Sequence, residues 1–143
     1  MAPATPITGI SHVDLSVRDR EASARWYVEV LGFEIRGEGV NERHGFSSTV
    51  LVHPNGPVSL ALVEHDGNPG TPFDERRCGL DHLSFELPAG FDVEQWARGL
   101  AERGYDAPDV GDDDGVPLAV LRDPDKIQIE IYAGPLAELG PSP

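Results

Sequence analysis

Cysteine is almost absent from this 143-residue chain, which has only Cys78. One cysteine excludes an intramolecular disulfide framework and a zinc site built on cysteine clusters, and it is typical of a reducing compartment. No run of about 18 apolar residues occurs, as a membrane span would need. The opening stretch MAPATPIT lacks the positive charge and the apolar core of an export signal. We therefore expect a cytoplasmic protein that does not cross a membrane.

Basic residues are also scarce, with 11 Lys and Arg against 25 Asp and Glu and a formal net charge of −14. So acidic a chain repels polyanions, which argues against nucleic acid or an anionic membrane as a partner. The length is that of one compact domain, so we expect a single domain over residues 1–143. The proline-containing ends, MAPATP and GPSP, predict loose tails.

What the chain does contain is a pair of similar strand patterns, ISHVDLSV (Ile10 to Val17) and LDHLSFEL (Leu80 to Leu87). Polar and apolar residues alternate in both, and this period of two is typical of a strand with one buried face. His12 and His82 occupy equivalent places on the polar face. Two matching segments point to an internal repeat.

Each strand pattern is followed by a helix pattern with recognisable ends. Asp19 is placed to cap a helix that ends near Gly32, and Asp92 opens, with Gln95, a helix that ends near Gly104. The apolar stripes consist of Ala22, Trp26 and Val30 in the first helix and of Val93, Trp96 and Leu100 in the second. We interpret Trp26 and Trp96 as core residues that dock each helix on its sheet.

The ends of the two halves also match, since TVLVHPNGPVSLAL (49–62) aligns with AVLRDPDKIQIEI (119–131). Both halves therefore predict a strand, a helix and three further strands. The predicted fold class is α+β, with two βαβββ modules in one chain, the first over about residues 8–66 and the second over about residues 79–133.

On the last strand, Glu130 points away from a row of isoleucines. A carboxylate in the middle of such a strand is costly to bury unless it is paired or bound to a cation. If the polar faces of the modules line one cleft, His12, His82 and Glu130 can converge as metal ligands. Two imidazoles and one carboxylate suit Fe(II), the favoured ion, and also admit Mn, Ni or Zn.

The first-module position equivalent to Glu130 is Ala61, which cannot coordinate a metal, so a symmetric four-ligand site is disfavoured. Glu64 follows three residues later, which puts it on the opposite face of a regular strand. It remains a candidate ligand only if a bulge intervenes, and a solvent-facing strand end is the alternative.

The paired modules, with SHVDLSVRD, WYVEVLGFE, DHLSFEL and DPDKIQIEI, resemble the vicinal oxygen chelate superfamily over nearly the whole chain. That superfamily includes glyoxalase I, extradiol dioxygenases, fosfomycin-modifying enzymes, methylmalonyl-CoA epimerases and bleomycin-sequestering proteins. The resemblance implies curved mixed sheets around a cleft and the metal ligands His12, His82 and Glu130. It also implies a homodimer, with the two halves paired within one chain or exchanged between chains.

The resemblance also indicates which activities fit less well. Glyoxalase I and the epimerases have Glu or Gln where this chain has Ala61, and extradiol dioxygenases have a tyrosine where it has Val120. We predict a divalent-metal-dependent enzyme of the glyoxalase or dioxygenase type, whose small substrate binds the metal through adjacent oxygens. Lyase, isomerase and dioxygenase reactions stay open. The alternative is a metal-free protein of the bleomycin-resistance type that sequesters a small molecule or antibiotic.

The general base is not singled out by the sequence. The candidates that share the polar faces are Asp14, Ser84, Glu86, Gln128 and Tyr132.

Three further histidines and three arginines have simpler interpretations. We predict a turn hydrogen bond for His53, solvent exposure for His44 and no specific role for His65. Surface ion pairs are the predicted use of Arg36, Arg76 and Arg77, with binding of a substrate carboxylate as the alternative.

Overall fold

The computed structural model describes residues 5–136, and the chain divides into two compact units, Met1–Thr71 and Pro72–Pro143. Each unit contains one of the predicted modules. The predicted tails fall largely on residues 1–4 and 137–143, which lie outside the described residues. That both modules form one domain stays a prediction.

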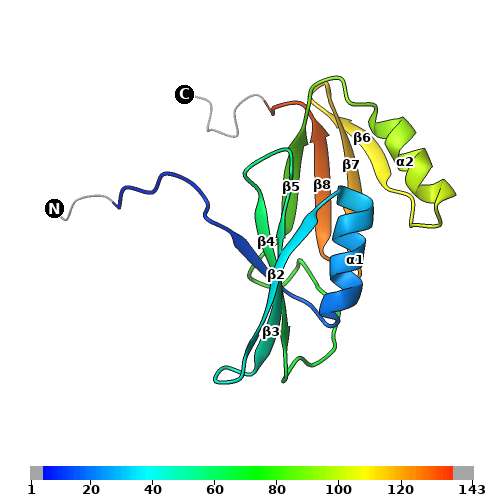
Figure 1. Cartoon of the computed structure of the whole chain (residues 1–143). Helices are drawn as coiled ribbons and strands as arrows, with labels where there is room; N and C mark the ends of the chain where they lie inside the picture. Colours follow the sequence, from blue (N-terminus) through cyan, green and yellow to red (C-terminus); the bar gives the residue numbers. More distant parts are fainter. Residues whose placement is uncertain (1–4, 137–143) are drawn as a thin grey trace. The chain divides into compact units, whose positions relative to one another are not determined.

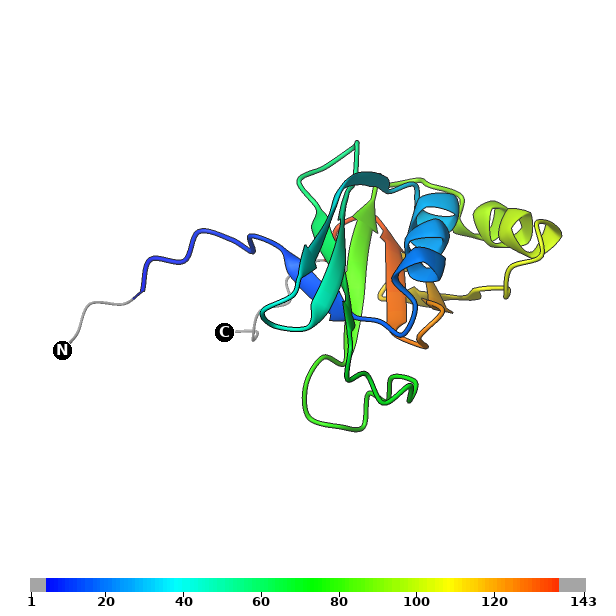
Figure 2. The same ribbon diagram turned by 60° about the horizontal axis from the view of Figure 1, so that its bottom comes forward.

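The first unit has the predicted order of one strand, one helix and three strands (Figure 1). Its elements are β1 (Val13–Ser16), α1 (Arg20–Leu31), β2 (Glu34–Asn41), β3 (Phe46–Val52) and β4 (Ser59–His65). The strands form a sheet in the order β1-β4-β3-β2, in which β1 and β4 are parallel and the other neighbours are antiparallel. Helix α1, the blue helix in Figure 2, packs against β3 and β4 of this sheet.

The second unit repeats this topology. Its elements are β5 (His82–Leu87), α2 (Val93–Glu102), β6 (Asp109–Asp113), β7 (Val116–Arg122) and β8 (Gln128–Ala133). The sheet order is β5-β8-β7-β6, again with a parallel first pair, β5 and β8. Two mixed four-stranded sheets with one helix each confirm the α+β class and the two βαβββ modules.

The helices begin where the sequence predicts. The side chain of Asp19 accepts a hydrogen bond from the backbone N–H of Ala22, and that of Asp92 accepts one from the backbone N–H of Gln95. Each cap satisfies an N–H group that has no partner within its own helix. Gly32 ends α1 in the left-handed conformation, with φ of 76°, which glycine adopts without steric cost.

Of the stripe predicted for α1, Val30 is buried as expected, whereas Ala22 and Trp26 are only half-buried, so the core face is turned by about one residue from the prediction. The buried residues of this helix are Ser23, Ala24, Tyr27 and Val30. Tyr27 is fully buried and packs edge-on against Phe33, whereas Trp26 is half-buried against the Tyr27 ring. Phe33 follows the Gly32 turn and enters the core, so it brings the Tyr27 side of the helix inward.

In α2 the predicted stripe is confirmed in most of its members. Val93 and Leu100 are buried, and the half-buried Trp96 packs against Val93, Ala119 and Ala133. Trp96 therefore docks this helix on its sheet, as predicted.

Candidate metal centre

The strands that carry the two predicted histidines have the expected alternation. In β1, Leu15 is buried, as is Val17 just after the strand, while Asp14 and His12, which precedes the strand, are exposed. In β5, Leu83 and Phe85 are half-buried and His82 is exposed. Each histidine thus lies on the polar side of its strand, at the strand's N-terminal end.

His82 and Glu130 face each other across the parallel pair β5 and β8. His82 Nε2 lies 3.4 Å from Glu130 Oε2, and the Glu130 side chain keeps only 15% of its exposure. Ser84, directly opposite Glu130 in the sheet register, donates its hydroxyl to Oε2 at 3.1 Å. Gln128 Nε2 donates to the other oxygen, Oε1, at 3.0 Å. The half-buried carboxylate therefore has partners at both oxygens.

The orientation of His82 is set by a residue that the sequence analysis missed. Asp81 Oδ1 lies 2.6 Å from Nδ1 of the ring. When Nδ1 donates its proton to this carboxylate, Nε2 of the neutral ring carries the lone pair that a metal needs, and it is Nε2 that faces Glu130. The available signal was an acidic residue immediately before the histidine.

His12 has a similar local setting in the first unit. Ser11 Oγ lies 3.1 Å from Nδ1 of His12, and Asp14 Oδ1 lies 3.6 Å from Nε2. Both histidines thus contact the preceding side chain through Nδ1. Since His12 belongs to a different unit from His82 and Glu130, their convergence on one metal ion stays a prediction. No group of three His, Cys, Asp or Glu side chains within residues 5–136 is arranged to hold a metal ion.

The donor atoms of His82 and Glu130 fit a divalent metal ion. Two atoms that coordinate one such ion at about 2.1 Å are separated by about 3.0–3.4 Å, depending on the angle between them. The 3.4 Å between Nε2 and Oε2 falls within this range. Asp81 accepts a hydrogen bond from His82 Nδ1, and Gln128 donates one to Glu130 Oε1; both are contacts of the kind that commonly orient metal ligands.

The sheet register bears out the predicted equivalence of Ala61 and Glu130. Asp14 lies opposite Ala61 in the first unit, just as Ser84 lies opposite Glu130 in the second. The methyl group of Ala61 offers no donor atom, so the first unit has no counterpart of the glutamate. On its other side, Glu130 is flanked by Val120 of β7.

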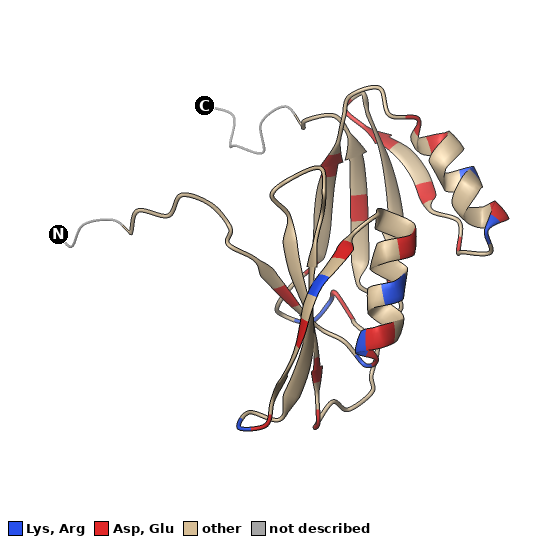
Figure 3. Cartoon of the chain, in the orientation of Figure 1, with Lys and Arg blue, Asp and Glu red and all other residues tan. Residues whose placement is uncertain are grey.

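Acidic side chains outnumber basic ones in the sheet that carries His82 and Glu130, in which β7 contributes Arg122. Strands β5, β6 and β8 carry several Asp and Glu residues but no Lys or Arg (Figure 3). Burial, with Glu130 and Asp113 nearby, raises the pKa of Tyr132 to about 12. The phenol is therefore neutral near pH 7, and its hydroxyl donates to Asp113 at 3.3 Å. It cannot act as a general base while it holds this proton.

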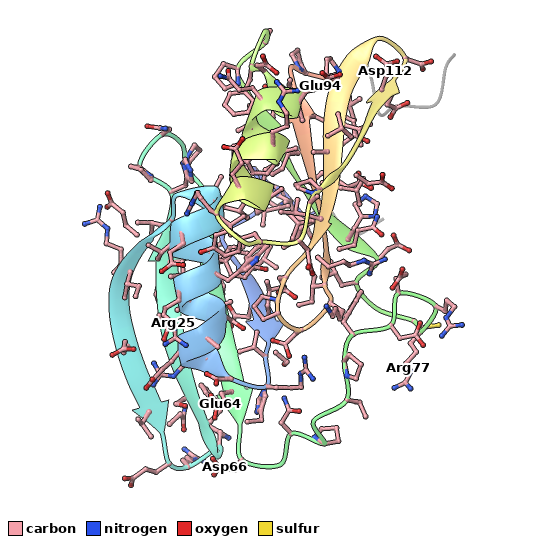
Figure 4. The ribbon with its side chains drawn as sticks, turned by 90° about the vertical axis from the view of Figure 1, so that its right-hand side faces the viewer. Arg25, Glu64, Asp66, Arg77, Glu94 and Asp112 are labelled. Carbon is pink, nitrogen blue, oxygen red and sulfur yellow. The ribbon has the colours of Figure 1, made fainter. Side chains whose placement is uncertain are left out.

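Glu64 lies on the face of its strand that meets the helix. Its Oε2 accepts the backbone N–H of Arg20 in the first turn of α1, at 2.8 Å, and Figure 4 shows the residue below that end of the helix. The carboxylate thus accepts a hydrogen bond from one of the N–H groups that have no partner within α1. Its negative charge also interacts favourably with the positive end of the helix dipole. No bulge in the pairing of β4 turns Glu64 to the Ala61 face.

Of the remaining histidines, His53 and His44 lie as predicted, and no role was predicted for His65. Nε2 of His53 lies 3.1 Å from the carbonyl of Leu31, and Nδ1 accepts the backbone N–H of Asn55, so the predicted turn hydrogen bond is confirmed. His44 is exposed in the turn after β2. His65 ends β4 and lies against the ring of Phe46.

The three arginines form the predicted surface ion pairs. Arg36 lies 3.9 Å from Glu34, and both Arg76 and Arg77 pair with Asp74. The hydrogen bonds from Arg76 lower the pKa of Asp74 to about 2, so this carboxylate is ionised near pH 7.

Comparison with known proteins decides the family. Residues 9–131 match the sequence profile of the Glyoxalase/Bleomycin resistance protein/Dioxygenase superfamily. The chain belongs to this superfamily. The match covers most of both units, so the repeated βαβββ architecture and the family assignment agree.

Several known proteins resemble the chain in sequence, in structure or in both. A domain from Frankia sp. EAN1pec, described as a glyoxylase/bleomycin resistance protein/dioxygenase domain, is 36% identical with a TM-score of 0.80 and covers 90% of this chain and 99% of its own. The uncharacterized protein YqjT of Bacillus subtilis is 27% identical over 85% of this chain and 96% of its own. A fosfomycin resistance protein, FosX from Listeria monocytogenes, solved with Mn(II) and sulfate, shares the fold at 15% identity and a TM-score of 0.64, with 91% of this chain and 95% of its own covered.

Within the described residues, no helix has both the length and the apolar character needed to cross a membrane.

Proposed function

We propose that the protein is a divalent-metal-dependent enzyme of this superfamily, with His12, His82 and Glu130 as the metal ligands. The observation that carries the proposal is the 3.4 Å separation of His82 Nε2 and Glu130 Oε2, each on a side chain held by a further hydrogen bond. A bound divalent ion would act as a Lewis acid toward a small substrate that binds it through two adjacent oxygens.

The chain's own residues have distinct parts in this proposal. Asp81 keeps the proton of His82 on Nδ1, so that Nε2 is available as a ligand. Ser84 and Gln128 hold the Glu130 carboxylate in place. Because Ser84, Gln128 and Tyr132 are all donors here, Asp14 and Glu86 are the remaining polar-face candidates for a general base.

The finer points of the reaction belong to the same proposal. Fe(II) is the favoured ion for two imidazoles and one carboxylate, with Mn(II), Ni(II) and Zn(II) as alternatives. The reaction is a lyase, isomerase or dioxygenase reaction on a small molecule. We further propose a cytoplasmic homodimer. The exposed thiol of Cys78 suits a reducing compartment.

The experiment that tests this proposal measures metal content. The purified chain is stripped with chelator and loaded anaerobically with Fe(II), Mn(II), Ni(II) or Zn(II), alongside His12→Ala, His82→Ala and Glu130→Ala. We expect about one ion per chain in the wild type and a loss of binding in each variant, since three ligands leave no spare donor. His44→Ala, which removes an exposed histidine, should bind like the wild type.

Absence of binding under every loading condition would contradict the metal-dependent enzyme. It would favour a protein that sequesters a small molecule or antibiotic, as the bleomycin-resistance type does. Ligand screening against the unmodified chain would then replace the search for a reaction.

A further inference from the structure

A continuous line of hydrogen-bonded side chains leads from the segment before β5 to Glu130. Glu75 receives two hydrogen bonds from Arg122, from Nη2 at 2.7 Å and from Nη1 at 3.1 Å. Arg122 Nη2 also donates to Gln128 Oε1 at 3.0 Å, and Gln128 Nε2 donates to Glu130 Oε1 at 3.0 Å. All four residues belong to the second unit.

The chemistry of these groups permits only one orientation of the Gln128 amide. A guanidinium group only donates hydrogen bonds, and an ionised carboxylate only accepts them. An amide between the two satisfies both when its oxygen faces Arg122 and its nitrogen faces Glu130. Gln128 is therefore set as a donor to Oε1, and Oε2 is the oxygen directed toward His82.

The far end of this line is itself anchored. The backbone N–H of Phe73 donates to the carbonyl of Asp125 at 2.8 Å, which ties the segment that carries Glu75 to the turn before β8. Hydrogen bonds from Arg122 lower the pKa of Glu75 to about 2, so the pair stays ionised near pH 7. Arg122 also donates to the carbonyl of Lys126. These contacts leave the guanidinium group little freedom to turn away from Gln128.

The first unit provides an internal comparison. In the two sheets, the pair Val52 and Ser59 occupies the register position that Arg122 and Gln128 occupy in the second unit. The pair Val52 and Ser59 belongs to the unit that has Ala61, and the pair Arg122 and Gln128 belongs to the unit that has Glu130. The βαβββ fold thus forms without an arginine and a glutamine at this position. Their presence is associated with the carboxylate and not with the fold.

We propose that Gln128 is a positioning residue that holds Glu130 with Oε2 toward His82, and that Arg122 and Glu75 act on the site only by fixing Gln128. The inference rests on the proposed metal-dependent function. Removing the amide would take away the donor at Oε1 and leave Ser84, at Oε2, to hold the carboxylate, so metal binding would weaken even though no ligand is lost.

The test uses the full chain and Mn(II) as the probe, with affinity measured by calorimetry and by electron paramagnetic resonance of the free ion. We expect Gln128→Met, which keeps the side-chain length but neither hydrogen bond, to weaken Mn(II) binding about tenfold or more, as loss of a contact to a metal ligand commonly does. The visible absorption of the Co(II)-loaded chain should change as well. Arg98→Met, which removes an exposed arginine of α2, is the control and should alter neither.

A double-mutant cycle tests the order of the residues. If Arg122 acts only through Gln128, Arg122→Met should weaken Mn(II) binding in the wild type but have no further effect in Gln128→Met. Glu75→Gln probes the same line from a loop outside the helices and strands, and it should weaken binding in the same direction to a smaller extent.

The outcomes separate this inference from the proposed function. If His82→Ala abolishes Mn(II) binding while Gln128→Met keeps wild-type affinity and an unchanged Co(II) spectrum, the positioning role is overturned and the metal site stands. The same holds if Gln128→Met lowers only the melting temperature. Independent, additive losses in the cycle would overturn the role given to Arg122. A wild-type chain that binds no metal would overturn the proposed function and this inference with it.

Discussion

The ring of His82 lies between two acidic side chains, Asp81 and Glu130. One ring nitrogen contacts Asp81 and the other faces Glu130, so the ring has defined partners on both sides although 38% of its side chain is exposed. Glu130 in turn has Ser84 and Gln128 at its two oxygens. An exposed histidine without such contacts would sample several rotamers. Here the hydrogen bonds select one orientation.

The contact between Asp81 and His82 yields a prediction at this scale. Asp81→Asn replaces an obligatory acceptor with an amide, so it weakens the preference for a proton on Nδ1 and makes Nε2 a poorer ligand. We expect the affinity for Mn(II) to fall about tenfold, the low end for such contacts because Asp81 is largely exposed. Calorimetric titration measures the change. Asp106→Asn, an exposed position in the loop after α2, is the control, and equal affinities of the two variants would contradict the role of Asp81.

At the scale of elements, the two helices show which features a sequence pattern predicts well and which it predicts poorly. Their N-terminal caps, Asp19 and Asp92, were predicted correctly because a cap depends on only a few neighbouring residues. The core face of α1 was predicted less well. Tyr27 and Trp26 are adjacent aromatic residues, and helical spacing alone does not decide which of them enters the core. Packing against Phe33 decides it.

The matched caps provide a prediction for the elements. Asp19→Ala and Asp92→Ala each remove the side-chain acceptor of one N-terminal N–H group, to Ala22 at 2.9 Å and to Gln95 at 2.8 Å. We expect each substitution to lower the free energy of unfolding by about 1 kcal/mol, measured by urea denaturation. Asp19→Asn keeps an acceptor and should retain most of the stability. A loss as large in Asp19→Asn as in Asp19→Ala would argue against the cap.

At the scale of the whole molecule, the chain contains the same architecture twice, but only the second copy has the glutamate of the proposed metal site. Both sheets have the same strand order and the same parallel first pair. The second unit has the carboxylate and its supporting side chains, whereas the first has Ala61 and contributes a histidine in the proposed site. This asymmetry suits three protein ligands and open positions for a substrate better than it suits a closed structural site with four ligands.

The proposed homodimer is the prediction that concerns the whole molecule. Sedimentation equilibrium of the purified chain should give the mass of two chains, independent of whether metal has been added. We expect the dimer to persist in the His82→Ala variant, because one metal ligand is a small part of a subunit contact, whether the two halves pair within one chain or are exchanged between chains. A monomer at all micromolar concentrations would contradict it.

The sequence by itself determined the features that depend on near neighbours. Alternation assigned the faces of the strands around His12 and His82, short motifs set the helix ends, and the internal repeat determined the two βαβββ modules. These signals depend on the local sequence, so they can be interpreted without knowledge of the tertiary packing.

Only the tertiary structure decided which side chains meet across strands. The parallel register of β5 and β8 brings Ser84 beside Glu130, and the antiparallel register of β7 and β8 brings Arg122 beside Gln128. The same packing directed Glu64 to the helix and turned Tyr27 into the core. Such contacts join residues far apart in the chain, and their register follows from the packing of whole faces.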